Sequence, residues 1–302
     1  MWAGRSEGGG GKRMKDIGRL GVWIFPDALS AREIAELAQG VERLGYATLW
    51  YPEGTGFETF AFGGFVLSET DRLRAASGIA NIYARDAVTA ISGHNSLNKL
   101  HGDRYILGLG VSHIPLVEGF RGHTYTKPVT TMRAYLDAME AAELSITAPE
   151  RNIVLAALGP NMLALARDRT KGAHPYLVTP EHTARAREIL GPDAWLCVEQ
   201  KICLTTDAAQ ARGIAANVLA LYLPWPNYRN NWLRLGFTEE ELSGRGSDRF
   251  LDAMVASGSA ADVRSRLQAH FDAGANHVCV QPLNADGGSA VDWRALEAVA
   301  EI

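Results

Sequence analysis

The sequence predicts a (β/α)8 barrel, in which eight parallel strands alternate with helices around a closed sheet. Short apolar segments and amphipathic segments of helical length alternate eight times from residue 17 onward. A doubly wound sheet is the second choice. It usually carries GxGxxG after its first strand, whereas the chain there reads WIFPDALS. Residues 17–302 are therefore expected to form a single barrel domain.

The expected strands are bounded by glycine, proline or polar residues. They cover 18–25, 47–50, 72–83, 105–111, 152–159, 173–178, 195–206 and 276–283. The helices between them follow recognisable capping patterns. Ser30 and Glu33 have capping-box spacing, Asp86 precedes a helix, and Pro180 stands at a first helical position after Thr179. The expected helices cover 30–45, 60–70, 87–102, 130–144, 160–172, 179–191, a segment from 207, and 259–274.

Two segments are too long for routine loops and predict insertions after the fourth and seventh strands. The first, IPLVEGFRGHTYTKP, suggests a functional excursion or lid. The second contains Trp225, Tyr228, Trp232 and Phe237. Its aromatic residues fit a pocket wall or a dimer surface equally well.

Composition narrows the possible partners. The 302 residues are 47% hydrophobic and carry a net charge of −4, which provides no basic surface for nucleic acid. Apolar runs stay shorter than a membrane span, and residues 1–16 lack the apolar core of a signal peptide. We expect a disordered extension over 1–16 and a cytoplasmic location. Cys197, Cys203 and Cys279 lie in apolar runs and are expected to be buried thiols.

Barrel enzymes carry their working residues at the carboxyl ends of the strands. The residues in such positions are Trp23, Phe25, Trp50, Glu53, Asn81, Ile82, 110–113, 159–162, 174–178 and Gln281. Each also has a structural interpretation. Glu53 could transfer a proton or be a solvated loop carboxylate, and Asn81 could contact a ligand or cap a strand end. Gly108 and Gly110 permit close packing or the approach of a flat ligand.

Two further segments carry groups suited to ligand binding or proton transfer. GPNM, at 159–162, places backbone N–H groups at a helix N-terminus, where an anion can bind. His113 could titrate near neutral pH or be a lone surface histidine. The histidines and cysteines show no metal-ligand spacing, and a GxSxG elbow is absent, so we expect neither a metal site nor an acyl-transfer serine.

GIANIYARDAVTA, GDRYILGLGVSH, LWYPEG, LAALGPNMLALA and GAHPYLVTPEH resemble blocks of the luciferase-like monooxygenase superfamily. They are most similar to an actinobacterial branch of coenzyme F420-dependent oxidoreductases. The resemblance implies a barrel that binds a flavin or deazaflavin. It also implies a bulge after the third strand with a non-prolyl cis peptide, at the position matching Asn81–Ile82. Where the family commonly has proline after ARD, this chain has Ala87.

The same resemblance implies roles for individual residues. Those implied to bind the cofactor are Glu53, Asn81, Ile82, Gly110, Val111, Ser112, Gly159, Pro160, Asn161 and Met162. Glu53 and His113 are candidates for proton transfer, and a Gln or Asn substitution at either should slow turnover while leaving cofactor binding largely intact.

The leading hypothesis is an oxidoreductase that exchanges hydride between F420 and a small organic substrate, without membrane or nucleic-acid partners and as a homodimer. One alternative is a two-component monooxygenase using reduced FMN and O2. The other is a cofactor-free barrel that acts as a binding protein.

Overall fold

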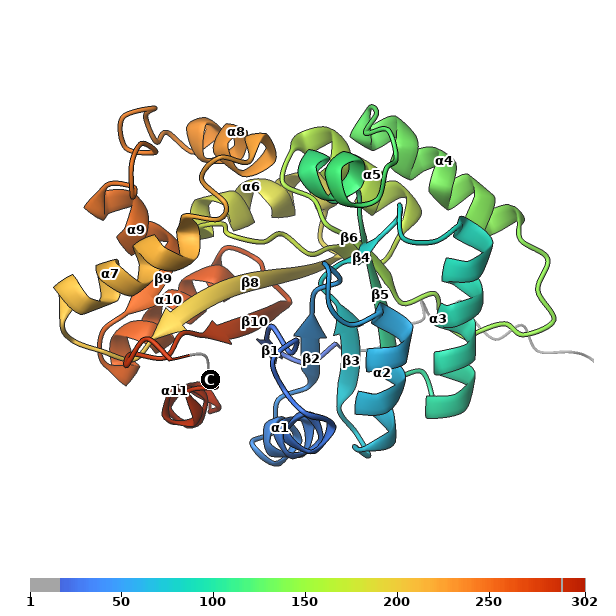
Figure 1. Cartoon of the computed structure of the whole chain (residues 1–302), viewed down its shortest axis with the longest axis horizontal. Coiled ribbons are helices and arrows are strands. Elements are labelled where there is room, and N and C mark those ends of the chain that lie inside the picture. Colours follow the sequence, from blue (N-terminus) through green and yellow to red (C-terminus); the bar gives the residue numbers. More distant parts are fainter. Residues whose placement is uncertain (1–16, 289, 302) are drawn as a thin grey trace, which may run out of the picture.

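Eight parallel strands close into a barrel with helices around it (Figure 1). This computed structural model describes residues 17–288 and 290–301, so the extension expected at 1–16 lies outside the described residues. The barrel strands are β1 (Leu20–Trp23), β2 (Thr48–Tyr51), β3 (Arg74–Ser77), β5 (Tyr105–Gly110), β6 (Ile153–Leu155), β7 (Gly172–Ala173), β8 (Trp195–Cys203) and β10 (His277–Pro282). β10 pairs with both β1 and β8, which closes the sheet. The predicted fold class is confirmed.

A one-residue bulge interrupts the ladder between the third and fourth barrel strands. Ala76 pairs with Ile106, and the short strand β4 (Ala80–Asn81) resumes the pairing at Ala80 with Leu109. Four steps along one chain thus oppose three along the other, which defines a bulge. Glycines in β5 make room for it. A Cβ on Gly108 would lie 2.0 Å from the Ser77 carbonyl oxygen, so this glycine is required for close backbone packing.

The helices that cover the barrel follow the strands in sequence (Figure 1). They are α1 (Ala31–Arg43), α2 (Thr59–Ser68), α3 (Ala87–His101), α4 (Pro128–Ala141), α5 (Pro160–Arg169), α6 (Pro180–Leu190), α7 (Ala208–Leu219), α10 (Ala260–Asp272) and α11 (Trp293–Val299). Ser30 and Glu33 form the expected capping box, and Asp86 accepts a hydrogen bond from the Thr89 amide. The short helix α11 is not among the segments predicted from the sequence.

Both expected insertions are present. The chain after β5 forms a π-helix (Pro115–Phe120) before α4 begins. The chain after α7 forms α8 (Pro226–Arg234), α9 (Asp248–Met254) and the strand β9 (Val255–Ser257), which pairs with the end of β8. The second insertion has its own apolar cluster, which includes Trp232 and Phe250.

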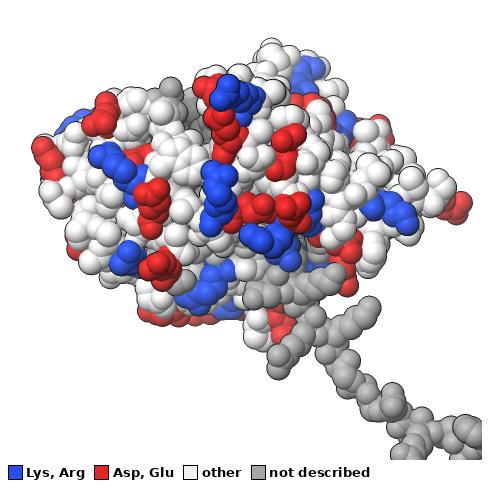
Figure 2. All heavy atoms as spheres, turned by 90° about the horizontal axis from the view of Figure 1, so that it is seen from below, with Lys and Arg blue, Asp and Glu red and all other residues white. Residues whose placement is uncertain are grey.

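The apolar core has two layers. One lies between the strands and the covering helices, and the other fills the barrel interior around Trp23, Trp50 and Ile106. Cys197, Cys203 and Cys279 are buried, free thiols, as expected. Acidic and basic side chains are interspersed on the face seen in Figure 2. Among the described residues, no helix is both long and apolar enough to cross a membrane.

Candidate active site

A cavity of about 660 Å³ opens at the carboxyl ends of the barrel strands. This volume lies within the range of about 300–1,000 Å³ that is typical of small-molecule sites. Its wall combines strand ends with both insertions. The lining residues used below are Trp23, Glu53, Gly78, Ile79, 110–113, 159–162, His174, Tyr176, Tyr222, Trp225, Asn227, Tyr228, Asn230 and Arg234. The position agrees with that of the active sites in this fold class.

The cavity brings together most of the residues that the sequence nominated. Glu53, the run 110–113 and the run 159–162 all line it, although they come from three separate segments. Gly110 faces the bulge, where a Cβ would meet the Ile79 side chain at 2.4 Å. The glycine alternatives therefore resolve toward close packing of the protein itself, and this packing also shapes the cavity wall.

Asn81 and Ile82 are exceptions, because neither lines the cavity. The predicted cis bond at Asn81–Ile82 is also wrong: the non-prolyl cis peptide lies between Gly78 and Ile79. The physical reason is the register of the bulge. β3 ends at Ser77. Gly78 and Ile79 then form part of the cavity wall, and β4 begins at Ala80. The Asn81 Oδ1 atom accepts from the Tyr83 amide 2.9 Å away, which matches the capping alternative.

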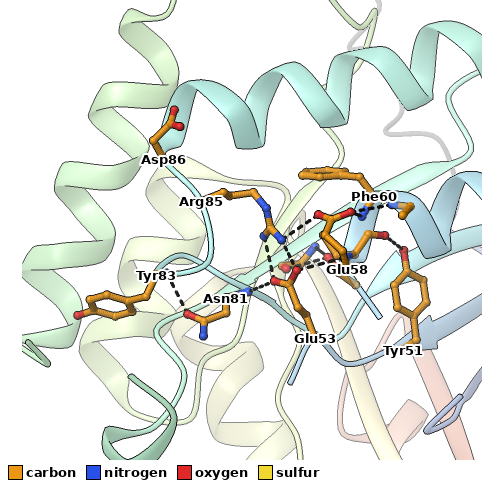
Figure 3. A network of polar contacts seen from close by, with 12 residues as sticks. Tyr51, Glu53, Glu58, Phe60, Asn81, Tyr83, Arg85 and Asp86 are labelled. Atoms are coloured by element: carbon orange, nitrogen blue, oxygen red, sulfur yellow. Dashed lines mark hydrogen bonds and ion pairs between the residues drawn. The ribbon is translucent and has the colours of Figure 1, made fainter. Parts of the chain in front are cut away.

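Glu53 lies at the centre of a buried polar network beside the cavity (Figure 3). The side chain is 4% exposed, and Arg85 reaches both carboxylate oxygens, with Nη1 2.9 Å from Oε2. Backbone amides complete the set, since Asn81 N donates to Oε2 over 2.8 Å and Thr59 N donates to Oε1 over 3.2 Å. Glu53 is the acceptor in every one of these contacts. Because the Asn81 amide belongs to β4, directly after the bulge, the carboxylate holds the bulge in place. Its role in proton transfer stays a prediction.

The Arg85 guanidinium also contacts the half-exposed Glu58, which begins α2 as its N-cap residue (Figure 3). Arg85 thereby joins the loop after β2 to the loop before α3. The Glu53 amide adds a backbone contact, donating to the Ile79 carbonyl over 3.2 Å. These contacts hold the bulge against the loop that follows β2.

His113 packs against the second insertion rather than standing alone on the surface. Its ring centroid lies 4.0 Å from that of Trp225 and 5.6 Å from that of Tyr228. Burial lowers the pKa of His113 to about 4, so the ring is neutral near pH 7. The neighbouring Ser112 adopts a φ of 56°, which bends the chain away from β5 toward this contact.

The N-terminus of α5 opens onto the cavity without a side-chain cap. Gly159 is its N-cap residue and provides no hydrogen-bonding side chain, while Pro160 follows at the first position. The amides of the first helical turn point outward from such an end and bind anions. Arg234 adds a formal positive charge, since its Nη2 atom would lie 3.8 Å from a Cβ at position 159. The end of α5 and Arg234 thus place backbone N–H donors and a positive charge on the same side of the cavity.

Sequence reasoning missed Arg234, Asn227 and Asn230, which all line the cavity from α8. The insertion itself was noticed for its aromatic residues. Of these, Trp225 and Tyr228 line the cavity, whereas Trp232 and Phe237 are buried in the cluster of the insertion. The available signal was the presence of polar residues between the aromatic positions. The sequence does not show, however, which strand ends this insertion packs against.

Two polar atoms at the floor of the cavity lack partners among the described residues, namely Trp23 Nε1 and His174 Nε2. The other imidazole nitrogen, Nδ1, lies 2.8 Å from the Cys197 carbonyl oxygen. The ring stacks on Trp50, with centroids 4.3 Å apart and planes at 15°. Burial lowers the pKa of His174 to about 4, so this ring too is neutral near pH 7.

A second polar cluster lies inside the barrel beneath Tyr176. The Lys201 ammonium is fully buried and donates to Tyr176 Oη and Gln281 Oε1, both at 2.8 Å, and to Glu199 Oε1 at 3.1 Å. Burial lowers the pKa of Lys201, and the Glu199 carboxylate opposes that shift. These partners satisfy all three ammonium protons, as a buried charge requires.

Within the described residues, no group of three or more histidine, cysteine, aspartate or glutamate side chains is placed to hold a metal ion. The polar atoms around the cavity are instead backbone amides, a guanidinium, carboxamides, an imidazole and an indole. Such donors and acceptors suit an organic ligand with an anionic group.

Comparison with known proteins agrees with this architecture. A protein of Mycobacterium tuberculosis, whose name assigns it provisionally to the coenzyme F420-dependent oxidoreductases, is 26% identical over 93% of this chain and 97% of its own length. The coenzyme F420-dependent tetrahydromethanopterin reductase of Methanopyrus kandleri has a similar fold, with a TM-score of 0.69 over 94% of this chain and 97% of that one, at 14% identity.

A second solved structure, an F420-dependent secondary alcohol dehydrogenase in complex with an F420-acetone adduct, aligns with a TM-score of 0.74. That alignment covers 96% of this chain and 98% of the dehydrogenase at 11% identity, so it shows the shared fold alone. The profile of the family described as luciferase-like monooxygenase matches residues 17–277. This chain therefore belongs to the luciferase-like monooxygenase family.

Proposed function

We propose that the protein is an oxidoreductase that transfers hydride between coenzyme F420 and a small organic substrate. The observation that carries the proposal is the arrangement of one cavity, in which a broad pocket over the bulge leads to an anion site at α5. A flat ring with a phosphate-bearing tail would match both parts. The coverage of the M. tuberculosis relative, 97% of its length, supports the same cofactor.

The residues present fit such a group. The amides of Asn161 and Met162 and the guanidinium of Arg234 would hold a phosphate, since all three lie at the uncapped end of α5. Gly78 and Ile79 would support the ring, because the clamp by Glu53 and Arg85 keeps the bulge in place. When bound, the deazaflavin supplies a carbon that accepts or releases hydride.

The remaining walls orient the substrate and exclude water. Phe25, Tyr176 and Trp225 give the cavity an apolar lining, and His113, packed against Trp225, is neutral near pH 7. A small substrate enclosed by these rings would leave its polar groups to the few donors and acceptors at the floor. Orientation of this kind can account for a large part of a rate enhancement.

A binding titration tests the proposal, with F420 and FMN as ligands of the same protein. The titration follows the quenching of cofactor fluorescence. FMN is the competitor because a solved 3,6-diketocamphane monooxygenase of similar fold is in complex with FMN. We expect clear preference for F420 and saturation at one site per chain. Tighter binding of FMN would favour the two-component monooxygenase, and absence of saturable binding to either would favour a cofactor-free barrel.

A further inference from the structure

The charged side chains that line the cavity are separated by sign. Among the lysine and arginine residues of the described chain, only Arg234 lines it, beside the N-terminus of α5. The acidic residues in the lining are Glu53 and Asp27. Glu53 is occupied by Arg85 and by two backbone amides. Asp27 is therefore the carboxylate that remains available to a ligand.

Asp27 and the N-terminus of α5 lie on opposite sides of the barrel. Asp27 follows β1, whereas α5 follows β6. In the closed strand order, β2, β3 and β5 separate these two strands in one direction, and β10, β8 and β7 separate them in the other. The mouth of the cavity is thus positive on the β6 side and negative on the β1 side.

The loop after β2 holds the Asp27 carboxylate in position. A Cβ on Gly56 would lie 2.0 Å from Asp27 Oδ1, and the Phe57 amide donates to the same oxygen over 3.4 Å. The side chain is exposed and forms no ion pair with any described residue. Oδ2 has no donor within the described part of the chain. The carboxylate is therefore fixed in place, and its charge is not neutralised by the protein around it.

An accessible aromatic ring belongs to the same loop as this carboxylate. Phe25 lines the cavity and is 51% exposed. Its ring packs edge-on against Trp23, with centroids 4.7 Å apart and planes at 79°. An aromatic face attracts a cation, and a carboxylate forms charge-assisted hydrogen bonds with an ammonium group. Phe25 and Asp27 together provide both features.

The other ionisable groups in the lining leave the charge of Asp27 uncompensated. His113 and His174 have pKa values lowered by burial to about 4, so both rings are neutral near pH 7. Arg234 lies on the opposite side of the mouth. A carboxylate or phosphate placed beside Asp27 would meet like charge, whereas an ammonium group would meet its complement.

We propose that Asp27 is a specificity-determining residue that binds a protonated amino group of the substrate, a small amine with an apolar body. The proposal rests on the proposed function, in which the coenzyme phosphate occupies the α5 side and leaves the β1 side to the substrate. The ammonium group lies at the mouth beside Asp27 and Phe25, and the apolar body extends toward the bulge. The amino group is a recognition element and takes no part in hydride transfer.

Three probes of one shape and different charge test the site without the coenzyme. Cyclohexylmethylamine is a cation near pH 7, because primary amines have pKa values of about 10.4, as lysine does. Cyclohexylmethanol is neutral, and cyclohexanecarboxylate is an anion. Nuclear magnetic resonance titration follows the backbone amides of Gly54 and Thr55, which line the cavity next to Asp27. We expect the amine to have the lowest Kd and the carboxylate the highest. Equal Kd values for the amine and the alcohol would overturn the proposal.

Two variants identify the residues responsible. D27N removes the charge but keeps an oxygen that can accept from the Phe57 amide, so the loop contact is retained. We expect D27N to raise the Kd of the amine about 2- to 5-fold, the effect of one ion pair near the surface, and to leave that of the alcohol unchanged. Added salt should weaken amine binding by the wild type but not by D27N. F25L should raise the Kd of the amine by a similar factor of about 2 to 5.

Asp193 provides the matched control. It is exposed, lies outside the cavity and precedes β8 at the amino end of the barrel. D193N changes the net charge as D27N does and should bind the amine as the wild type does. If D27N and D193N have the same Kd for the amine, the assignment of Asp27 is overturned.

A separate arm distinguishes the substrate side from the coenzyme. The amine titration is repeated with the protein saturated with F420, and we expect both ligands to bind together. If F420 displaces the amine, the β1 side belongs to the coenzyme and the substrate assignment is overturned. If the protein does not bind F420, the proposed function fails, but the charge series still decides whether Asp27 binds an ammonium group.

Discussion

Glu53 and Arg85 form an ion pair in which both side chains are almost fully buried, with Arg85 Nη1 2.9 Å from Glu53 Oε2. The pair joins the loop after β2 to the loop before α3, and the same carboxylate accepts from the amide of Asn81 in β4. The clamp therefore keeps the bulge at Gly78 and Ile79 in position beneath the cavity. Glu53, which the sequence nominated for proton transfer, supports the wall of the cavity in this structure.

Breaking this pair should destabilise the fold. E53Q leaves the buried Arg85 with only the half-exposed Glu58 as a charge partner. Removal of one partner from a buried pair costs up to about 3–5 kcal/mol in the free energy of unfolding. Urea denaturation measures the change. D252N is the control, because its pair with Arg212 is partly exposed and contributes at most about 1 kcal/mol. Equal losses in the two variants would mean that burial adds nothing to the Glu53 pair.

A carboxylate at position 159 should have opposite effects on stability and on cofactor binding. In G159D the new side chain can cap α5, which raises the free energy of unfolding by a few tenths of a kcal/mol. The same charge repels a phosphate at that helix end, so the Kd for F420 should rise about tenfold or more. G159A is the control, since its Cβ has only Arg234 Nη2 nearby, at 3.8 Å. Unchanged affinity in G159D would place the phosphate elsewhere.

Arg234 should contribute to affinity through its charge. We expect R234Q to raise the Kd for F420 about tenfold, the effect of losing one charge-assisted hydrogen bond, and to weaken its dependence on salt. Fluorescence titration at two salt concentrations measures both effects. R245Q removes a charge from the same insertion at a position outside the cavity and should bind F420 as the wild type does. Equal behaviour of the two variants would exclude Arg234 from the anion site.

Acid should destabilise the protein through its buried histidines. Burial lowers the pKa of His94 and His174 to about 4 and that of His270 to about 3. Between these values and about 6.5, the unfolded chain binds more protons than the folded one, so stability falls as pH falls. The stabilisation is fully present above about pH 6.5, and each histidine contributes a slope of up to about 1.4 kcal/mol per pH unit.

Urea denaturation between about pH 7 and pH 5 measures this slope. H94N removes one of the three histidines, so its free energy of unfolding should depend less steeply on pH than that of the wild type. A slope identical to that of the wild type would show that His94 takes up no proton on unfolding in this range.

The predicted placement of residues at the cavity was correct where it depended on position along a strand. Gly110 to His113 and Gly159 to Met162 follow directly after β5 and β6, and the carboxyl ends of barrel strands all meet at one cavity. It was wrong by three residues at the bulge. The apolar run GIANIY reads as one continuous strand, whereas the structure divides it at Gly78 and Ile79. A shift of register moves side chains to another face, so Asn81 and Ile82 leave the cavity.

The sequence by itself determined the barrel, because strand and helix periodicities, capping residues and glycine positions are local properties that each segment carries. It also determined which segments end at the cavity. Only the tertiary structure decided which side chains meet there. Arg85 reaches Glu53 from another loop, Arg234 approaches Gly159 from a distant insertion, and Trp23 and His174 both pack against Gly78 inside the barrel. Such pairings depend on packing between segments far apart in the chain, and that packing leaves no periodic signal in the sequence.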